Sequence, residues 1–264
     1  MKKIFRAACC AVPLYSISIM VFSQGASMIN SAVTHAAGGM TFSSSMSLSN
    51  SQSFNKDFSQ YSMHPLMSNG GINGPASAYG TKGTRMLFDD WVKGTVIKTT
   101  GEVIDGNKYY FNFDKVTNNL IVTLDKKEVI EVYKEFIQSF NFSDKGKVFT
   151  FEKFVPIQRF RFVQVLVKDS AKYSLYKSVN TRFVAANYTT NGLTETGQLY
   201  DEFVDMNKYY IVYKEEIRPV ELKFNKIKKA LKEQSSRVKD FYADHLADEV
   251  DEKYLTGIVE YLNQ

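Results

Sequence analysis

The feature that most constrains the fold is a series of short apolar runs between residues 91 and 222, separated by Gly, Asn, Asp and Lys. About ten runs follow one another, and no helix-length segment lies between them. Parallel strands need long crossover connections, for which this spacing leaves no room. The sequence therefore predicts a mainly β fold with an α tail, in which an antiparallel meander forms a curved sheet, a sandwich or an incomplete barrel. The runs are WVKGTVIK (91–98), KYYFNFD (108–114), LIVTLD (120–125), EVIEVY (128–133), EFIQSFNF (135–142), KVFTFEKF (147–154), FRFVQVLVK (160–168), KYSLYKSV (172–179), KYYIVYK (208–214) and IRPVEL (217–222).

Local signals refine this pattern at three places. The triplet DGN at 105–107 is the strongest short hairpin signal and predicts a tight turn before the run at 108–114. Gly94 inside the first run indicates a bulge or a close backbone approach. The run at 160–168 is apolar on both faces, which predicts a central strand.

The last forty or so residues change to a helical pattern with apolar residues three and four positions apart. The spacing predicts two or three short amphipathic helices, with Ser235 or Ser236 capping the second. We expect their apolar stripe to pack on itself and on one face or end of the sheet. The stripe comprises Ile227, Leu231, Val238, Phe241, Tyr254, Leu255, Ile258 and Leu262.

Charge is divided along this helical segment. Residues 223–239 hold seven basic residues against Glu233, and residues 240–260 hold seven acidic residues against Lys253. One interpretation is that the helices pair through complementary faces. The alternative is a basic first helix that faces a membrane.

The N-terminal residues predict a secretory signal peptide over 1–23. Lys2, Lys3 and Arg6 precede an apolar stretch that is too short for a membrane span and is broken by Pro13. Its removal leaves 30 basic and 28 acidic residues of the original 33 and 28, so the net charge falls from +5 to +2. This small surplus argues against a nucleic-acid partner. Removal of the signal peptide also leaves no transmembrane segment. The two cysteines are removed with it, which excludes disulfides in the remaining chain.

The next segment, residues 24–82, is dominated by Ser, Gly, Asn and Met and lacks regular apolar spacing. Such a composition buries too little apolar surface to offset the entropy of ordering, about 1–2 kcal/mol per residue. We therefore expect a disordered leader over 24–82, a β domain over 83–222, and a helical segment over 223–264 packed on the β domain. The alternative for the leader is a segment that folds on a partner.

Catalytic side chains are scarce. Of the three histidines, two fall in the expected leader, and His245 lies on a helix stripe, so histidine-dependent hydrolysis and two-histidine metal binding lack the residues they need. No cofactor motif is present. A hydrolase using two carboxylates remains a minor alternative. Its candidates are Asp89, Asp90, Glu102, Glu152, Asp201 and Glu202.

Aromatic residues supply the candidate binding surface. The candidates are Trp91, Tyr109, Tyr110, Tyr209 and Tyr210, although Trp91 fits a strand anchor better than a ligand platform. The triplet DSA at 169–171 matches an O-glycosylation pattern, with Ser170 as the acceptor. Six phenylalanines spaced in i, i+2 pairs could instead line a pocket for a lipid or another hydrophobic ligand. These are Phe111, Phe113, Phe149, Phe151, Phe160 and Phe162.

The region from residue 83 to the end resembles a broad family of uncharacterised exported proteins of Bacteroidota. The resemblance lies in GTRMLFDDWVKGTVIKTTGEV, FRFVQVLVKDSAKYSLYKS, YDEFVDMNKYYIVYKEEIRPVEL and the final KKALKEQSSRVKDFYADHLADEVDEKYLTGIVEYLNQ. These motifs are apolar and turn positions, so the resemblance implies a shared fold with closing helices and carries over no catalytic residue. Together, these observations lead us to expect a non-enzymatic protein of the periplasm or outer envelope that binds another envelope protein or a glycan.

Overall fold

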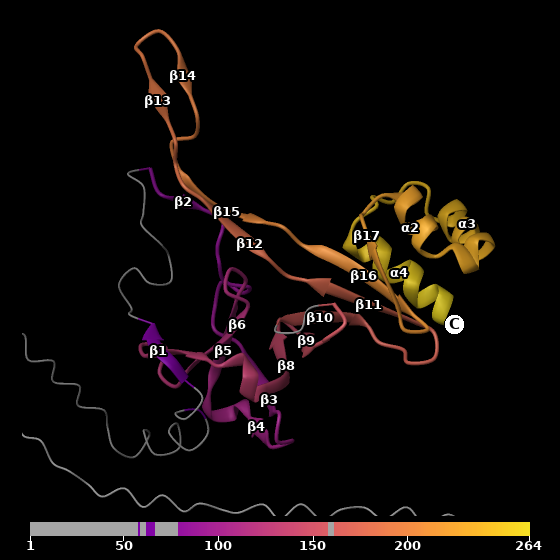
Figure 1. Cartoon of the computed structure of the whole chain (residues 1–264), viewed down its shortest axis with the longest axis horizontal. Coiled ribbons are helices and arrows are strands. Elements are labelled where there is room, and N and C mark those ends of the chain that lie inside the picture. Colours follow the sequence, from indigo (N-terminus) through magenta and orange to yellow (C-terminus); the bar gives the residue numbers. More distant parts are fainter. Residues whose placement is uncertain (1–57, 59–61, 67–78, 158–160) are drawn as a thin grey trace, which may run out of the picture. The chain divides into compact units, whose positions relative to one another are not determined.

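The computed structural model describes Phe58, Ser62–Leu66, residues 79–157 and residues 161–264. The chain is mainly β, with antiparallel strand pairing except between one pair of short strands, and three short α-helices follow the last strand (Figure 1). In these described ranges the sheets do not close into a barrel. The predicted fold class, a β meander with an α tail, is confirmed. The expected signal peptide lies outside the described residues.

The largest sheet has eight strands, and every neighbouring pair in it is antiparallel. Strand β10 lies between β9 and β11, so the central position predicted from its apolar faces is confirmed. Strand β17 forms one edge, where Pro219 is tolerated because an edge strand does not need every N–H. In sheet order the strands are β17 (Glu216–Val220), β16 (Lys208–Tyr213), β11 (Tyr173–Ser178), β10 (Phe162–Val167), β9 (Lys147–Lys153), β8 (Ile137–Asp144), β3 (Lys93–Lys98) and β4 (Val103–Asp105).

A second sheet has four strands, and isolated bridges link its strand β5 to Met86 and to Val92, which directly precedes β3 of the first sheet. All five residues of its strand β6 are buried, and the central three, Leu120, Ile121 and Val122, are apolar. In order, its strands are β1 (Ser62–Leu66), β7 (Val129–Val132), β6 (Asn119–Thr123) and β5 (Tyr110–Asp114).

The hairpin predicted at DGN is wrong. Strand β4 ends at Asp105 and pairs only with β3, whereas β5 pairs with β6, so the chain changes sheets at this point through the 3-10 turn η2 (Gly106–Lys108). A tight two-residue hairpin of the DG type needs positive φ at its central residues, and Gly106 is not among the positive-φ glycines. Its role is steric, because a Cβ there would lie 1.7 Å from the Gly94 carbonyl oxygen. The close approach predicted at Gly94 is confirmed, since a Cβ there would lie 2.1 Å from the Asn141 oxygen.

Aromatic rings fill the space between these two sheets, and we call this cluster the phenylalanine core. Phe140 stacks on Phe151 at 5.0 Å and meets Phe162 edge-on at 4.8 Å, while Phe113 lies 4.9 Å from Phe151. The rings of this core are Phe58, Phe88, Tyr109, Phe111, Phe113, Phe140, Phe142, Phe151 and Phe162. Four of the rings suggested for a lipid pocket are core members and Phe149 packs against them, while Phe160 lies outside the described residues. Because these rings contact one another, the described phenylalanines behave as core side chains.

A second cluster, the helical core, joins the helices to the other end of the eight-stranded sheet. The helices are α2 (Phe224–Ala230), α3 (Ser235–Asp244) and α4 (Glu252–Asn263), and the predicted apolar stripe is buried in full. The packing predicted for the helices, on themselves and on the sheet, is therefore confirmed. Members of the helical core are Tyr173, Leu175, Tyr209, Ile211, Val220, Ile227, Ala230, Leu231, Val238, Phe241, Tyr254, Leu255, Ile258, Val259 and Leu262.

Helix capping differs from expectation. Ser235 is the first residue of α3 with helical dihedrals, and no side chain caps that helix, so the predicted serine cap is wrong. Helix α4 instead carries a side-chain cap, because the Asp251 carboxylate accepts a hydrogen bond from the Tyr254 backbone N–H at 2.8 Å.

Parts of the expected leader belong to the β domain. Phe58 is fully buried and meets the Tyr109 ring edge-on at 5.1 Å, and Ser62–Leu66 adds β1 to the edge of β7. Thr81–Lys82 forms β2, which pairs in parallel with β15. The leader boundary at residue 82 is thus corrected for these residues, because distant strands pair with them and distant rings bury Phe58, which their own sequence does not indicate. Residues 24–57 lie outside the described part of the chain.

Strands β11 and β16 continue into a long two-stranded ribbon (Figure 1). The pairing of Ser178 with Lys208 is followed in the same register by that of Thr181 with Asp205. The ribbon contains β12 (Thr181–Val184), β13 (Thr189–Thr190), β14 (Glu195–Thr196) and β15 (Asp201–Asp205). Its turn holds Gly192 at φ +84° and an almost fully exposed Leu193.

Candidate functional site

The five aromatic candidates do not form one surface. Tyr109 belongs to the phenylalanine core and Tyr209 to the helical core, so neither presents a free ring. The Tyr209 hydroxyl donates a hydrogen bond to Glu252 at 2.8 Å. Trp91 is half-buried at the start of the β domain, as expected for a strand anchor. The predicted single aromatic surface is therefore wrong.

Tyr110 is half-buried and covered by lysines. The Lys93 ammonium lies 3.6 Å from the Tyr110 ring centroid, and the Lys126 ammonium lies 4.6 Å from it. Lys93 also donates hydrogen bonds to the backbone oxygens of Asn107 and Tyr109. This ring is thus engaged in cation–π contacts within the chain.

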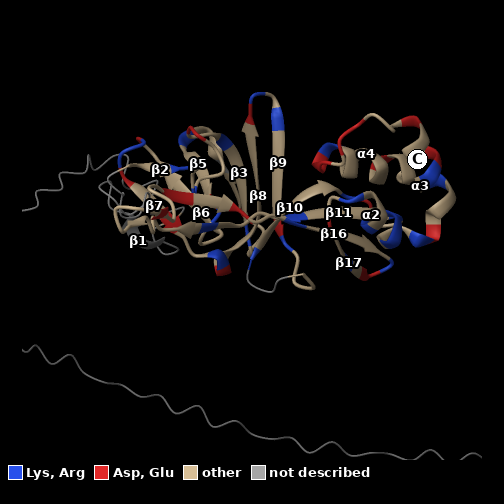
Figure 2. Cartoon of the chain, turned by 90° about the horizontal axis from the view of Figure 1, so that it is seen from above, with Lys and Arg blue, Asp and Glu red and all other residues tan. Residues whose placement is uncertain are grey.

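Tyr210 lies in a groove between α2 and the strands β16 and β17, which we call the basic groove. Its volume is about 940 Å³. Six basic and two acidic side chains are among its lining residues. The groove is lined by Asn207, Lys208, Tyr209, Tyr210, Glu216, Arg218, Pro219, Val220, Glu221, Leu222, Lys223, Lys226, Lys229, Ala230 and Lys232. Figure 2 shows blue Lys and Arg segments along α2, beside these strands.

Arg218 is the best-anchored charge of the basic groove. Its guanidinium donates to both carboxylate oxygens of Glu233 at 2.6 and 2.7 Å, to Glu216 at 2.5 Å, and to the Ala230 carbonyl at 2.6 Å. These acidic partners raise the pKa of Arg218, and the same hydrogen bonds lower the pKa of Glu233 to about 2. Arg218 therefore links β17 to the end of α2. Its charge is neutralised by Glu216 and Glu233 and is not available to a ligand.

The remaining lysines of the basic groove carry its surplus charge. Lys223 and Lys226 pair with Glu221 at 3.0 and 3.5 Å. For Lys208, Lys229 and Lys232 the structure records no ion pair with another described residue. Three cationic side chains thus line the groove without an ion pair, and the charge of Lys232 helps to lower the pKa values of Glu216 and Glu233. The excess of positive charge favours an anionic ligand.

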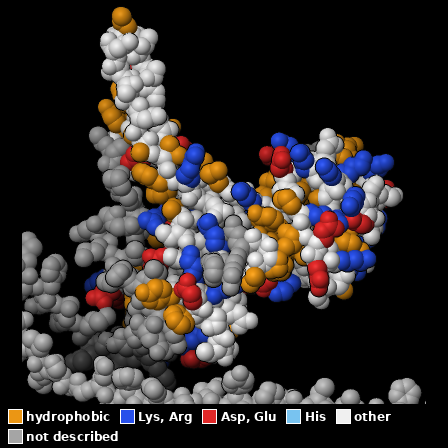
Figure 3. Space-filling model, viewed as in Figure 1, with side chains coloured by type: hydrophobic (Ala, Val, Ile, Leu, Met, Phe, Trp, Pro, Cys, Tyr) orange, Lys and Arg blue, Asp and Glu red, His pale blue; other side chains and the backbone are white. Residues whose placement is uncertain are grey.

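The predicted pairing of the basic and acidic stretches is only partly confirmed. Helices α3 and α4 do pack together, but through the helical core, and no ion pair among the described residues joins the two stretches. Arg237 instead donates to the carbonyl oxygens of Tyr261 and Leu262, at the C-terminal end of α4, where a cation is favourable. Both signs of charge consequently stay exposed over the helices (Figure 3).

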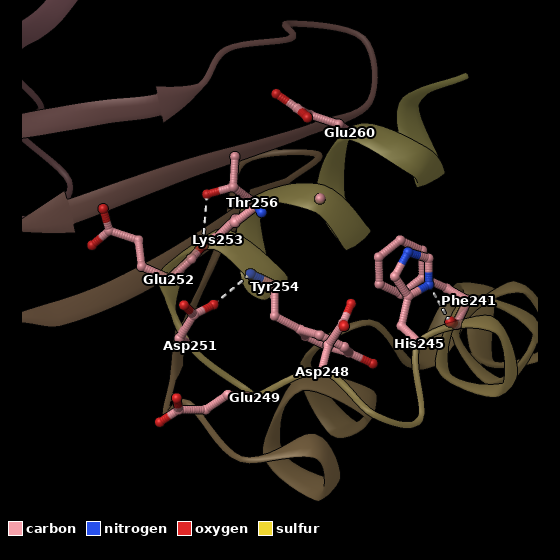
Figure 4. Close-up of a pocket in the computed structure, with 11 residues that line it drawn as sticks. Phe241, His245, Asp248, Glu249, Asp251, Glu252, Lys253, Tyr254, Thr256 and Glu260 are labelled. Carbon is pink, nitrogen blue, oxygen red and sulfur yellow. Dashed lines mark hydrogen bonds between the residues drawn. The ribbon is translucent and has the colours of Figure 1, made fainter. Parts of the chain in front are cut away.

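A second cavity, the acidic pocket, opens between the end of α3 and the first turns of α4 (Figure 4). Its volume is about 650 Å³, and acidic residues dominate its charge. Asp251 is held by its capping bond, and Glu252 is held by Lys177 at 2.7 Å and by Tyr209. The pocket is lined by Phe241, His245, Asp248, Glu249, Asp251, Glu252, Lys253, Tyr254, Thr256, Gly257 and Glu260.

The six carboxylates suggested for a hydrolase are spread over separate elements. Glu102 pairs with Lys98 at the β3–β4 turn. Glu152 on β9 accepts hydrogen bonds from Lys168 at 2.6 Å and from the Tyr176 hydroxyl at 3.1 Å. Burial and the Glu152 carboxylate raise the pKa of Tyr176.

The other four candidates are no closer to forming a catalytic pair. Asp201 on β15 is buried and accepts from the Ala186 N–H at 2.8 Å, and Glu202 is its neighbour on the same strand, where alternate residues face opposite sides. Asp89 and Asp90 are exposed in the bend before β3. These positions suit structural and solvated roles.

One charged cluster around Asp114 was not predicted from the sequence. Asp114 is almost fully buried, pairs with Arg85, and accepts hydrogen bonds from the backbone N–H of Val116 and the hydroxyl of Thr117. Burial and the Asp114 charge raise the pKa of Glu131. Arg85 and Glu131 come from distant parts of the chain, so no local motif reveals that they lie near Asp114. The local hydrogen bonds from Val116 and Thr117 to Asp114 fix the β5–β6 turn.

Ser170 is exposed in the turn between β10 and β11. The Asp169 carboxylate accepts hydrogen bonds from the backbone N–H groups of Ala171 and Lys172, at 2.8 and 3.0 Å, and so shapes this turn around the serine. The site is accessible to a modifying enzyme, and glycosylation of Ser170 stays a prediction.

Comparison with protein-family models, with curated proteins and with solved structures finds no match to this chain. None of the described helices has the length and apolar character needed to cross a bilayer. Among the described residues, no group of three or more metal-ligating side chains comes together.

Proposed function

We propose that this protein is a non-enzymatic, exported component of the cell envelope that binds an anionic glycan in the basic groove. The observation that carries the proposal is the set of three lysines, Lys208, Lys229 and Lys232, that share the groove with Tyr210 and form no ion pair with a described carboxylate. Ammonium groups attract carboxylate or sulfate groups of a polysaccharide. The half-buried Tyr210 ring offers an apolar face with a polar tip, which suits a sugar ring.

A glycan fits the basic groove better than a nucleic acid does. The net charge expected after export is only +2, so the whole chain does not act as a polycation. Six basic residues line the groove, and the neighbouring stretch from Asp240 to Glu260 is acidic. The small net surplus favours a ligand that also offers sugar rings to the Tyr210 side chain over one held mainly by phosphate contacts.

The test is calorimetric titration of the mature chain with polygalacturonate, with neutral dextran and single-stranded DNA as comparisons. We expect saturable binding of polygalacturonate at about 20 mM salt that weakens strongly at about 300 mM, since exposed charges are screened. The double variant Lys229→Glu, Lys232→Glu should lose this binding.

The matched control is Lys145→Glu, Lys147→Glu, which removes two exposed lysines at the β8–β9 turn, away from the residues that line the groove. It should bind polygalacturonate like the unchanged protein. Equal binding of dextran, or an equal loss in the control variant, would refute the assignment of the groove. Tighter binding of DNA would point to a nonspecific polyanion surface.

A further inference from the structure

The acidic pocket contains more negative charge than its own contacts neutralise. Five lining residues are acidic and Lys253 is the one basic residue among them, which leaves four negative charges in excess. Asp251 and Glu252 have partners, as described above. For the side chains of the other three, Asp248, Glu249 and Glu260, the structure records no hydrogen bond or ion pair with a described residue. All three residues are exposed, so their carboxylates are open to a ligand that enters the pocket.

Aromatic rings form one wall of the acidic pocket. Phe241 and His245 stack with centroids 3.9 Å apart and planes 10° from parallel. The ring plane of Tyr254 is nearly perpendicular to both, at 81° to the plane of Phe241 and 90° to that of His245. Figure 4 shows the Tyr254 side chain running from α4 toward Asp248 and the His245 ring. Ring faces attract cations, so the wall and the carboxylates favour the same kind of ligand.

The Tyr254 hydroxyl supplies an independent observation. Tyr254 is 5% exposed, and its hydroxyl oxygen is buried without a hydrogen-bond partner in the protein. Buried tyrosine hydroxyls are normally paired, because an unpaired one forfeits its interaction with water. Burial and the nearby Asp248 charge raise the pKa of Tyr254, so the hydroxyl stays neutral and keeps a lone pair for a donor.

We propose that the acidic pocket binds a primary alkylammonium group, from a free amine or from a lysine side chain of a partner. The ammonium would lie against the rings of Phe241 and Tyr254 and donate hydrogen bonds to Asp248 and to the Tyr254 hydroxyl. A quaternary ammonium has no N–H to donate, so it leaves these acceptors unpaired. This pocket is separate from the basic groove, and the proposal does not depend on the glycan.

The experiment is a titration of the isotope-labelled mature chain with cadaverine, followed by nuclear magnetic resonance at the backbone amides of Gly257 and His245. We expect saturable shifts with cadaverine and much weaker shifts with tetramethylammonium. Asp248→Asn should weaken cadaverine binding about tenfold, as expected when one charged hydrogen-bond partner is removed. Tyr254→Phe should weaken it about fivefold while leaving the melting temperature unchanged or higher, because a buried unpaired hydroxyl is lost.

The matched control is Asp244→Asn, which removes an exposed acid of α3 that does not line the pocket. It should leave cadaverine binding unchanged. A parallel titration with the peptide acetyl-Gly-Lys-Gly-amide separates the two sources, because tighter peptide binding supports a partner lysine and tighter cadaverine binding supports a free amine. The proposal is overturned by absence of saturable shifts, by equal binding of tetramethylammonium, by tighter binding of Ca²⁺ at the same amides, or by an equal loss in Asp244→Asn.

Discussion

The phenylalanine core and the helical core share one sheet, yet they differ in what surrounds them. Around the phenylalanine core, buried polar side chains tie backbone to backbone, as Asn112 does with both the N–H and the carbonyl of Phe88. Around the helical core lie both described cavities and a surplus of each sign of charge. Buried polar atoms without a recorded partner occur in both regions, at the Tyr254 hydroxyl and at Asn119 Oδ1 on β6, so the cavities and the charge make the difference. Charged groups in a cavity that do not stabilise the fold are candidates for binding. We infer that the first region is scaffold and the second carries the function.

The sharpest contrast in stability comes from Phe140. This ring is 1% exposed and lies within 6 Å of four other rings of the phenylalanine core. Phe140→Ala should lower the free energy of unfolding by about 3–5 kcal/mol, since it removes a large side chain and leaves a cavity. Urea denaturation measures the change. A loss below about 1 kcal/mol would mean that this core is loosely packed.

Phe241 is the corresponding test on the helical side. It is buried in the helical core but also forms the wall of the acidic pocket. Phe241→Ala should cost about 3 kcal/mol, at the low end of the range for buried phenylalanine, because one side of the ring borders the pocket. Cadaverine binding should weaken in the folded variant. An unchanged melting temperature would show that the helices do not depend on this ring for their packing.

Asn118 tests the polar ties of the scaffold. It has positive φ in the β5–β6 turn, and its fully buried amide bonds both the N–H and the carbonyl of Phe162, at 2.7 and 3.0 Å. Asn118→Ala should cost about 2 kcal/mol, because two buried backbone groups lose their partner and the left-handed backbone disfavours Ala. Asn118→Gly keeps the backbone conformation but not the bonds. If the glycine variant matches the unchanged protein in urea denaturation, the side-chain bonds contribute nothing.

The smallest effect concerns acid. Arg218 lowers the pKa of Glu233 to about 2, below its ordinary value of 4.5. A carboxyl group with a lowered pKa in the folded state stabilises that state above its unfolded pKa, and the contribution is lost as the pH falls from about 4.5 toward 2. Glu233→Gln should therefore show a shallower loss of melting temperature over this range. Parallel acid curves for the two proteins would show that this pair does not stabilise the fold.

The sequence predicted the strands and helices well because their apolar spacing is local. It did not predict their partners. Phe58 packs against Tyr109, which lies fifty-one positions away in the sequence. Gly106 does not adopt the hairpin conformation, because its backbone lies close to the Gly94 carbonyl. The composition of the turns predicts neither contact. Sheet membership therefore had to come from the structure.

The candidate site was predictable to a similar degree. The division of charge in residues 223–260 is visible in the sequence. The ion pairs that Arg218 and Lys177 form with carboxylates of this segment are not. Alternation along β16 does separate Tyr209, on the same face as the buried Ile211, from Tyr210. That alternation excludes Tyr209 from the binding surface. The unpaired Tyr254 hydroxyl has no signature in the sequence, because burial without a partner is a property of the packed helices.

The most direct test of the division between scaffold and binding region is a map of backbone amide shifts in the mature chain, recorded with polygalacturonate and then with cadaverine. Polygalacturonate should move amides of β16, β17 and α2, and cadaverine should move amides at the end of α3 and the start of α4. The amides of β5, β6, β8 and β9 should stay unchanged with both ligands. Shifts concentrated in those four strands, with the helices unaffected, would contradict the assignment of function to the helical side.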